Sequence, residues 1–183
     1  IKKKFGYNSF EIIELDAYYK DLSHLSFSER EKTNFDHPTS FDFDLLVKHL
    51  DNLEKKNKIN IPIYNYKTHT RMRKTKLINK KKLLIIEGIF SFINKKLRDK
   101  MTFKVFLNIS EKIRLERRLK RDTIDRARTI KSINRQLNNT VIPMHKKYVQ
   151  PSIEFADLVI ENRKYQETKD ILFKKIERIL NDR

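Results

Sequence analysis

Several carboxylates in this sequence are placed where they could take part in phosphoryl transfer. Asp16 and Glu87 each follow a stretch of apolar residues, and Asp36 lies in the turn Phe35-Asp36-His37-Pro38. Farther along the chain comes a set of closely spaced arginines, namely Arg118, Arg121, Arg126 and Arg128. Carboxylates can hold Mg²⁺ and orient a hydroxyl group, while arginines can neutralise phosphates. These residue types are therefore those of a phosphoryl-transfer site.

Each of these features also has a plainer explanation. An arginine stripe on a helix is usually a solvated face, and a carboxylate after a strand can be the first exposed residue of a core strand. Only the carboxylates and arginines together favour a phosphoryl-transfer site. Whether they can form one depends on the helices and strands that position them.

The aliphatic run Leu83–Ile86 predicts a strand buried on both faces, which is typical of a parallel sheet. Ligands of open α/β sheets bind beyond the carboxyl ends of the strands, so we expect Glu87 to point into a site. Gly88 would let the backbone pass close by. A second strand, Phe10–Leu15, runs directly into Asp16.

The remaining pattern alternates strands with helices. Two overlapping Ser-x-x-Glu capping boxes over 26–31 predict the start of a short helix. We expect further helices over 42–56, from Glu111 with Ser110 as its cap, over 130–147 with a perturbation at Pro143, and over 170–180. A hairpin is expected over 59–78, and strands over 103–109 and 158–160. Asp122 to Thr129 is expected to be a charged connection. This order predicts an α/β fold with a parallel sheet flanked by helices, in a single domain over residues 1–183.

Charge, apolar content and the lack of cysteine limit the kinds of protein that this chain could be. The net charge of +18 favours an anionic partner, but the lysines are scattered and no recognition helix or zinc spacing is present, so nucleic acid is not expected as the main ligand. No apolar run approaches the roughly 20 residues of a membrane span, so no membrane association is expected. The sequence contains no cysteine, and it shows no signal peptide, which favours the cytoplasm.

Several segments resemble the uridine-cytidine kinase family in their order and spacing. They are Asp16-Ala17-Tyr18-Tyr19-Lys20-Asp21-Leu22-Ser23-His24-Leu25, Asn34-Phe35-Asp36-His37-Pro38, Tyr64-Asn65-Tyr66-Lys67-Thr68-His69-Thr70-Arg71, Ile86-Glu87-Gly88-Ile89 and Arg117-Arg118-Leu119-Lys120-Arg121-Asp122. The resemblance extends from about Glu14 to Ile160. Each segment is short, but together and in register they are specific.

The resemblance implies transfer of the γ-phosphate of ATP, or GTP, to the 5′-hydroxyl of uridine or cytidine, with Mg²⁺. It also implies a fold like that of the P-loop nucleoside triphosphate hydrolases, with a β-hairpin flap at 59–78 and an arginine-bearing lid at 118–130. A homotetramer is the assembly that the family suggests.

The resemblance implies a role for each matching residue. Asp16 matches the catalytic aspartate that contacts the 5′-hydroxyl, Glu87 matches the residue that helps hold Mg²⁺, and Asp36 resembles the carboxylate that binds the ribose hydroxyls. The base would be read by Tyr64 and His69 between aromatic walls formed by Tyr19, Phe35 and Tyr66. Arg118 and Gln136 match substrate contacts, and Arg121 and Arg126 match lid arginines.

The sequence departs from the family in one respect. It has no Gly-x-x-x-x-Gly-Lys-[Ser/Thr] segment, so the first strand and the phosphate loop are absent from this chain. We expect the natural chain to start earlier, or the protein to be an inactive nucleoside-binding remnant; a basic RNA-binding module is a third alternative. Without that loop we expect weak uridine binding, hardly any ATP binding, and exposure of Ile12, Ile13, Leu84 and Ile86.

Overall fold

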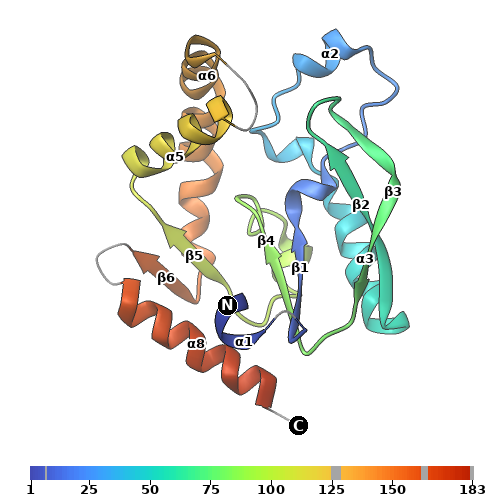
Figure 1. Ribbon diagram of the computed structural model, residues 1–183, viewed down its shortest axis with the longest axis vertical. Helices are drawn as coiled ribbons and strands as arrows, with labels where there is room; N and C mark the ends of the chain where they lie inside the picture. Colours follow the sequence, from blue (N-terminus) through green and yellow to red (C-terminus); the bar gives the residue numbers. More distant parts are fainter. Residues whose placement is uncertain (7, 125–128, 162–164, 182–183) are drawn as a thin grey trace. The chain divides into compact units, whose positions relative to one another are not determined.

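This computed structural model describes residues 1–6, 8–124, 129–161 and 165–181, which form both strands and helices (Figure 1). The chain folds as two compact units, Ile1–Thr102 with Phe173–Arg183, and Phe103–Leu172. The single domain over 1–183 stays a prediction. The predicted α/β class, with parallel strands and flanking helices, is confirmed.

The first unit contains most of the strands. Its elements are α1 (Lys2–Phe5), β1 (Phe10–Glu14), the 3₁₀ turn η1 (Leu15–Tyr18), α2 (Phe27–Glu31), the 3₁₀ turn η2 (Pro38–Ser40), α3 (Phe43–Lys56), β2 (Lys58–Asn65), β3 (Thr70–Asn79), β4 (Leu83–Glu87) and α4 (Lys95–Arg98). β1 and β4 are parallel neighbours, from Phe10 opposite Leu83 to Glu14 opposite Glu87.

The coverage of these two strands differs from what the sequence predicts. β4 is only half-buried along its aliphatic run, so it is not enclosed on both faces. Ile13 is fully buried, because it belongs to a core that also contains Leu15, Tyr18 and Leu46. Ile12, Leu84 and Ile86 are intermediate rather than exposed. The expectation that these aliphatic residues would be exposed was therefore wrong.

Helix α3 and the hairpin that follows it have clear sequence causes. The Asp42 side chain accepts a hydrogen bond from Leu45 N at 3.0 Å and caps the helix, while Leu46, Leu50 and Leu53 form its buried side. β2 packs against α3 and pairs with β3 in antiparallel register, with an irregularity between Pro62 and Tyr64. The predicted hairpin is confirmed.

The second unit holds the other parallel pair. Its elements are β5 (Val105–Asn108), α5 (Glu111–Ile124), α6 (Ile130–Gln136), the π segment η3 (Leu137–Val141), α7 (Ile142–Met144), the π segment η4 (His145–Val149), the 3₁₀ segment η5 (Gln150–Phe155) and β6 (Leu158–Glu161). π segments on both sides of Pro143 agree with the predicted perturbation. Helix α8 (Tyr165–Asn181) starts earlier than the predicted Asp170. In the described ranges, no helix combines the length and apolar character needed to cross a bilayer.

Candidate active site

The carboxyl ends of β1 and β4 bring acidic side chains together. Glu14 and Glu87 are register partners at the ends of the two strands, and Asp16 lies just beyond β1 in η1. Burial raises the pKa of the Glu87 carboxyl, and the negative charges of Glu14 and Asp16 raise it further. The predicted pair Asp16 and Glu87 therefore interacts electrostatically, and this edge of the sheet favours a cation.

Gly88 allows this close approach. Its φ is 152°, and a Cβ atom built on it would lie 2.6 Å from Leu15 Cβ. Any larger residue would push the end of β4 away from η1, the turn that carries Asp16. The expected close passage of backbone at Gly88 is therefore present.

The residues predicted to enclose the base form a cluster of rings in the first unit. The Tyr19 ring lies 5.5 Å from Phe35 and 5.0 Å from Tyr64, between centroids. Phe35 stacks on His69 at 4.6 Å, and Tyr64 meets Tyr66 edge-on at 5.6 Å. The fold thus brings together predicted residues from the segment after η1, from the turn before η2 and from the hairpin.

Tyr19 connects this ring cluster to the carboxylates. Burial raises the pKa of its hydroxyl, and the negative charges of Asp16 and Asp36 raise it further. The proposed catalytic and ribose-binding carboxylates therefore both act on one phenol. The same hydroxyl donates a hydrogen bond to the Phe35 carbonyl at 3.3 Å, which links the turn that contains Asp36 to Tyr19.

The hydroxyl of Tyr64 is the most informative atom of the cluster. Tyr64 is only 7% exposed, and within the described residues its Oη is buried without a hydrogen-bond partner. Leaving a buried hydroxyl unsatisfied is costly, so each such group in a native structure needs an explanation, and a bound ligand is one. A ligand that accepts a hydrogen bond among these rings would satisfy it.

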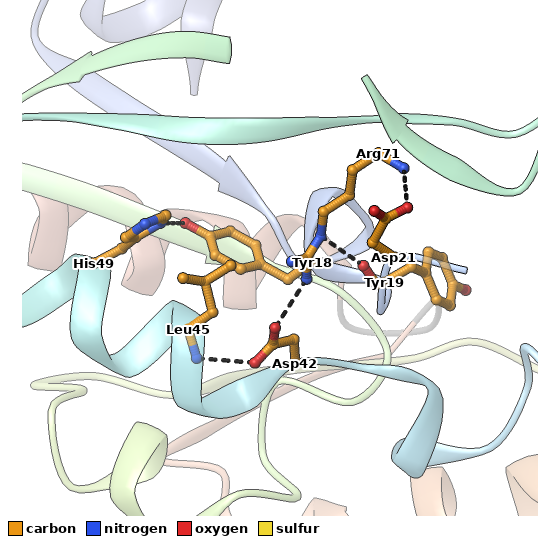
Figure 2. Close-up of polar contacts among 7 residues, drawn as sticks. All are labelled: Tyr18, Tyr19, Asp21, Asp42, Leu45, His49 and Arg71. Carbon is orange, nitrogen blue, oxygen red and sulfur yellow. Dashed lines mark hydrogen bonds and ion pairs between the residues drawn. The ribbon is translucent and has the colours of Figure 1, made fainter. Parts of the chain in front are cut away.

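The structure also shows residues whose roles the sequence analysis missed. Arg71 on β3 donates from Nε to the Tyr19 carbonyl at 2.9 Å and meets Asp42 Oδ2 at 3.1 Å (Figure 2). Arg30 on α2 donates to the Thr68 carbonyl at the hairpin turn, at 3.0 Å. The only earlier signal was the presence of Arg71 at the end of a matching segment.

The predicted arginine set lies in the second unit. Arg118 and Arg121 are on α5, and Asp122 beside them is fully buried, with Arg121 Nη2 at 2.9 Å from Oδ1 and Arg118 Nε at 3.5 Å from Oδ2. The expected start of the charged connection at Asp122 was wrong, because α5 continues to Ile124 around this buried pairing; residues 125–128 of that connection lie outside the described residues. Gln136 ends α6. Arg126 and Arg128 lie outside the described residues.

The carboxylates of Glu14, Asp16 and Glu87, here called the acidic edge, are ligands of the kind that bind Mg²⁺. Mg²⁺ is usually held in such sites by one or two carboxylates together with water and substrate phosphates. Among the described residues no group of at least three His, Cys, Asp or Glu side chains could hold a metal alone. The raised pKa of Glu87 fits a cation site, since a bound cation would stabilise its ionised form.

Comparison with known proteins identifies the family. The model of the phosphoribulokinase/uridine kinase family matches residues 2–169. The chain belongs to this family. A uridine kinase from Clostridium novyi (strain NT) is 40% identical over 183 residues, which are 100% of this chain and 88% of the relative. One from Escherichia coli (strain K12) is 40% identical over 160 residues, which are 87% of this chain and 75% of the relative.

Solved structures agree with this family assignment at the level of the fold. Phosphoribulokinase from Rhodobacter spheroides superposes with a TM-score of 0.63 at 11% identity, covering 84% of this chain and 60% of that one. The YGR205w protein gives a TM-score of 0.57 at 15% identity, covering 89% and 78%. This member of the phosphoribulokinase/uridine kinase family therefore has the predicted P-loop kinase type of fold.

Proposed function

We propose that this protein is a pyrimidine nucleoside kinase, which transfers the γ-phosphate of a nucleoside triphosphate to the 5′-hydroxyl of uridine or cytidine and yields UMP or CMP. Relatives named uridine kinase at 40% identity over most of the chain support the reaction. One structural observation supports a pyrimidine nucleoside as the substrate. The Tyr64 hydroxyl lies inside a cluster of aromatic rings and has no hydrogen-bond partner among the described residues. That hydroxyl can donate to a carbonyl of the base.

The nucleoside would be held by residues of the first unit. Rings at Tyr19, Phe35 and His69 can pack on the flat faces of a pyrimidine, while Tyr64 donates to its edge. Asp36, an acceptor-only carboxylate, suits the two hydroxyl donors of ribose. Its electrostatic interaction with the Tyr19 hydroxyl, which raises the pKa of that group, supports this role.

The transfer step would use Asp16 to orient the 5′-hydroxyl and to accept its proton late in the reaction. Such a role needs position more than basicity, because the transition state of phosphoryl transfer is loose. Glu87 would hold Mg²⁺, which when bound neutralises charge on the phosphates. Arg118, Arg121 and Arg126 would contact substrate and phosphates, with ATP or GTP as the donor.

The alternatives have less support. The similarity to proteins named uridine kinase favours the kinase over an inactive nucleoside-binding remnant or a basic RNA-binding module. A homotetramer, the flap and lid roles of 59–78 and 118–130, and a cytoplasmic location stay predictions.

A product assay tests the proposal. Purified protein restored to full length, with a phosphate loop, would be supplied with Mg-ATP and, separately, with uridine, cytidine, adenosine or ribulose 5-phosphate, and the phosphorylated product would be separated by chromatography. We expect UMP and CMP, and little product from the other acceptors. Phosphorylation of ribulose 5-phosphate alone would contradict the proposal and point to the other branch of the family.

A further inference from the structure

Arg71 joins the hairpin to other segments of the first unit (Figure 2). Its Nε donates to the carbonyl oxygen of Tyr19 at 2.9 Å, and its Nη2 lies 3.1 Å from Asp42 Oδ2. Its backbone N–H donates to Asp21 Oδ1 at 3.2 Å. One residue of β3 therefore holds the segment after η1 and the start of α3 at the same time.

Asp42 is itself fixed on both sides. Its Oδ1 accepts from Leu45 N at 3.0 Å, which anchors it to α3, and its backbone N–H donates to the Tyr18 carbonyl at 2.8 Å. The side chains of Arg71 and Asp42 are 19% and 32% exposed. A charge-assisted pair that is partly shielded from water and anchored on one side holds its geometry better than a fully exposed pair.

The register of the hairpin connects the contacts of Arg71 to the ring cluster. Arg71 is the antiparallel partner of Tyr64 on β2. The arginine thus fastens the strand pair that carries Tyr64 to the backbone of Tyr19, whose ring lies 5.0 Å from the Tyr64 ring.

We propose that Arg71, held by Asp42, is a positioning residue for the nucleoside site: it sets the distance between the hairpin ring of Tyr64 and the ring of Tyr19. The proposal rests on the pyrimidine nucleoside kinase function proposed above. Arg71 acts through the Tyr19 carbonyl and makes no contact with the base. Its loss should weaken nucleoside binding and leave the phosphate donor unaffected.

The first test compares Arg71→Met and Arg71→Lys with Arg73→Met, which removes an exposed arginine from the same strand. Loss of one charge-assisted contact corresponds to roughly a tenfold rise in KM for uridine in Arg71→Met. KM for ATP should stay unchanged. Lysine cannot form the two-pronged contact, so Arg71→Lys should recover only part of the loss, and Arg73→Met should behave like the unmodified protein.

A mutant cycle with Asp42→Asn tests the link between the two residues. Asparagine is also a good N-cap, so the variant keeps the acceptor for Leu45 N and removes the charge that faces Arg71. We expect the double variant to have the same uridine KM as Arg71→Met alone, because both substitutions remove the same contact between residues 71 and 42. Additive effects of the two substitutions would overturn the pairing.

The outcomes separate this inference from the proposed function. If the protein restored to full length, without any substitution, phosphorylates no pyrimidine nucleoside, the proposed function fails. If it does so and Arg71→Met keeps its uridine KM, only the positioning role fails. Equal losses toward uridine and ATP, together with a lower melting temperature, would show that Arg71 merely supports folding and would also overturn the inference.

Discussion

Glu87, the last residue of β4, is the register partner of Glu14, the last residue of β1. Two parallel strands thus end in carboxylates side by side, and Asp16 follows a short distance beyond. Burial and the neighbouring negative charges raise the pKa of Glu87 above that of an ordinary glutamate. This arrangement disfavours the ionised side chain until a cation is bound.

Replacing Glu87 by glutamine should therefore raise stability while lowering activity. A carboxyl whose pKa is raised on folding stabilises the folded state when protonated, and that stabilisation is lost as the pH rises. Glutamine removes the charge, so the melting temperature at neutral pH should increase. The turnover number should fall by at least about tenfold, as for other residues that support a metal.

The exposed Glu31 provides the matched control for Glu87, since Glu31→Gln should change neither quantity. Thermal melts and steady-state assays of both variants supply the measurement. A Glu87→Gln protein with a lower melting temperature and full activity would contradict the account of the acidic edge.

Removing single hydroxyls from two buried tyrosines should have opposite effects on stability. Tyr64 Oη has no partner among the described residues, so Tyr64→Phe should leave the melting temperature unchanged or raise it. The Tyr18 hydroxyl is hydrogen-bonded to His49 Nδ1 at 2.9 Å, so Tyr18→Phe should cost about 1 kcal/mol.

Tyr64→Phe should nevertheless weaken uridine binding, because the Tyr64 hydroxyl is proposed to donate a hydrogen bond to the base. Tyr64→Phe should raise KM for uridine by roughly tenfold, the effect of losing one hydrogen bond in a site that excludes water. Chemical denaturation and steady-state kinetics of the two variants check both statements. A destabilised Tyr64→Phe protein with unchanged uridine kinetics would show that this hydroxyl has a structural partner instead.

The catalytic assignment of Asp16 predicts a separation of binding from turnover. In a chain restored to full length, Asp16→Asn keeps size and hydrogen bonding but removes the charge and the proton acceptor. The turnover number should fall by at least about 10²-fold, while calorimetry should still detect uridine binding. Unchanged turnover would remove Asp16 from the mechanism.

Much of the fold could be predicted from local patterns. The spacing of Leu46, Leu50 and Leu53 indicates α3, and the end of an aliphatic run places Glu87 at the edge of the sheet. The capping box that starts at Ser26 forms as its Ser-x-x-Glu spacing predicts. Such signals work because they depend on neighbours in the chain.

The contacts that hold the site together could not be predicted in this way. Arg71 meets Tyr19 across 52 positions and Asp42 across 29, and no periodicity records such a pairing. The burial of Asp122 was missed for a related reason. A charged residue in a run of arginines suggests a solvated segment, whereas Asp122 here is fully buried and paired with Arg118 and Arg121.

The stability of the protein should fall between pH 6.5 and about 4 partly because of His145. Burial, and after it the positive charge of Arg114, lowers the pKa of His145 from 6.5 to about 4. The unfolded chain then takes up a proton at a higher pH than the folded chain, so stability present above pH 6.5 is lost as the pH falls.

The variant His145→Gln tests this pH dependence. Its melting temperature should fall less between about pH 7 and about pH 5 than that of the unmodified protein. His24→Gln, at an exposed position, should keep the original slope. Parallel slopes for all three proteins would remove His145 from the acid response.

The most direct test of the central claim is to observe which rings surround bound uridine. Magnetisation transfer from the H5 and H6 protons of uridine to the aromatic protons of the protein can be assigned ring by ring in a nuclear magnetic resonance experiment. The account predicts transfer to the rings of Phe35, Tyr64 and His69, and loss of the Tyr64 signal on replacement by leucine. Bound uridine that transfers magnetisation to none of these rings would contradict the account.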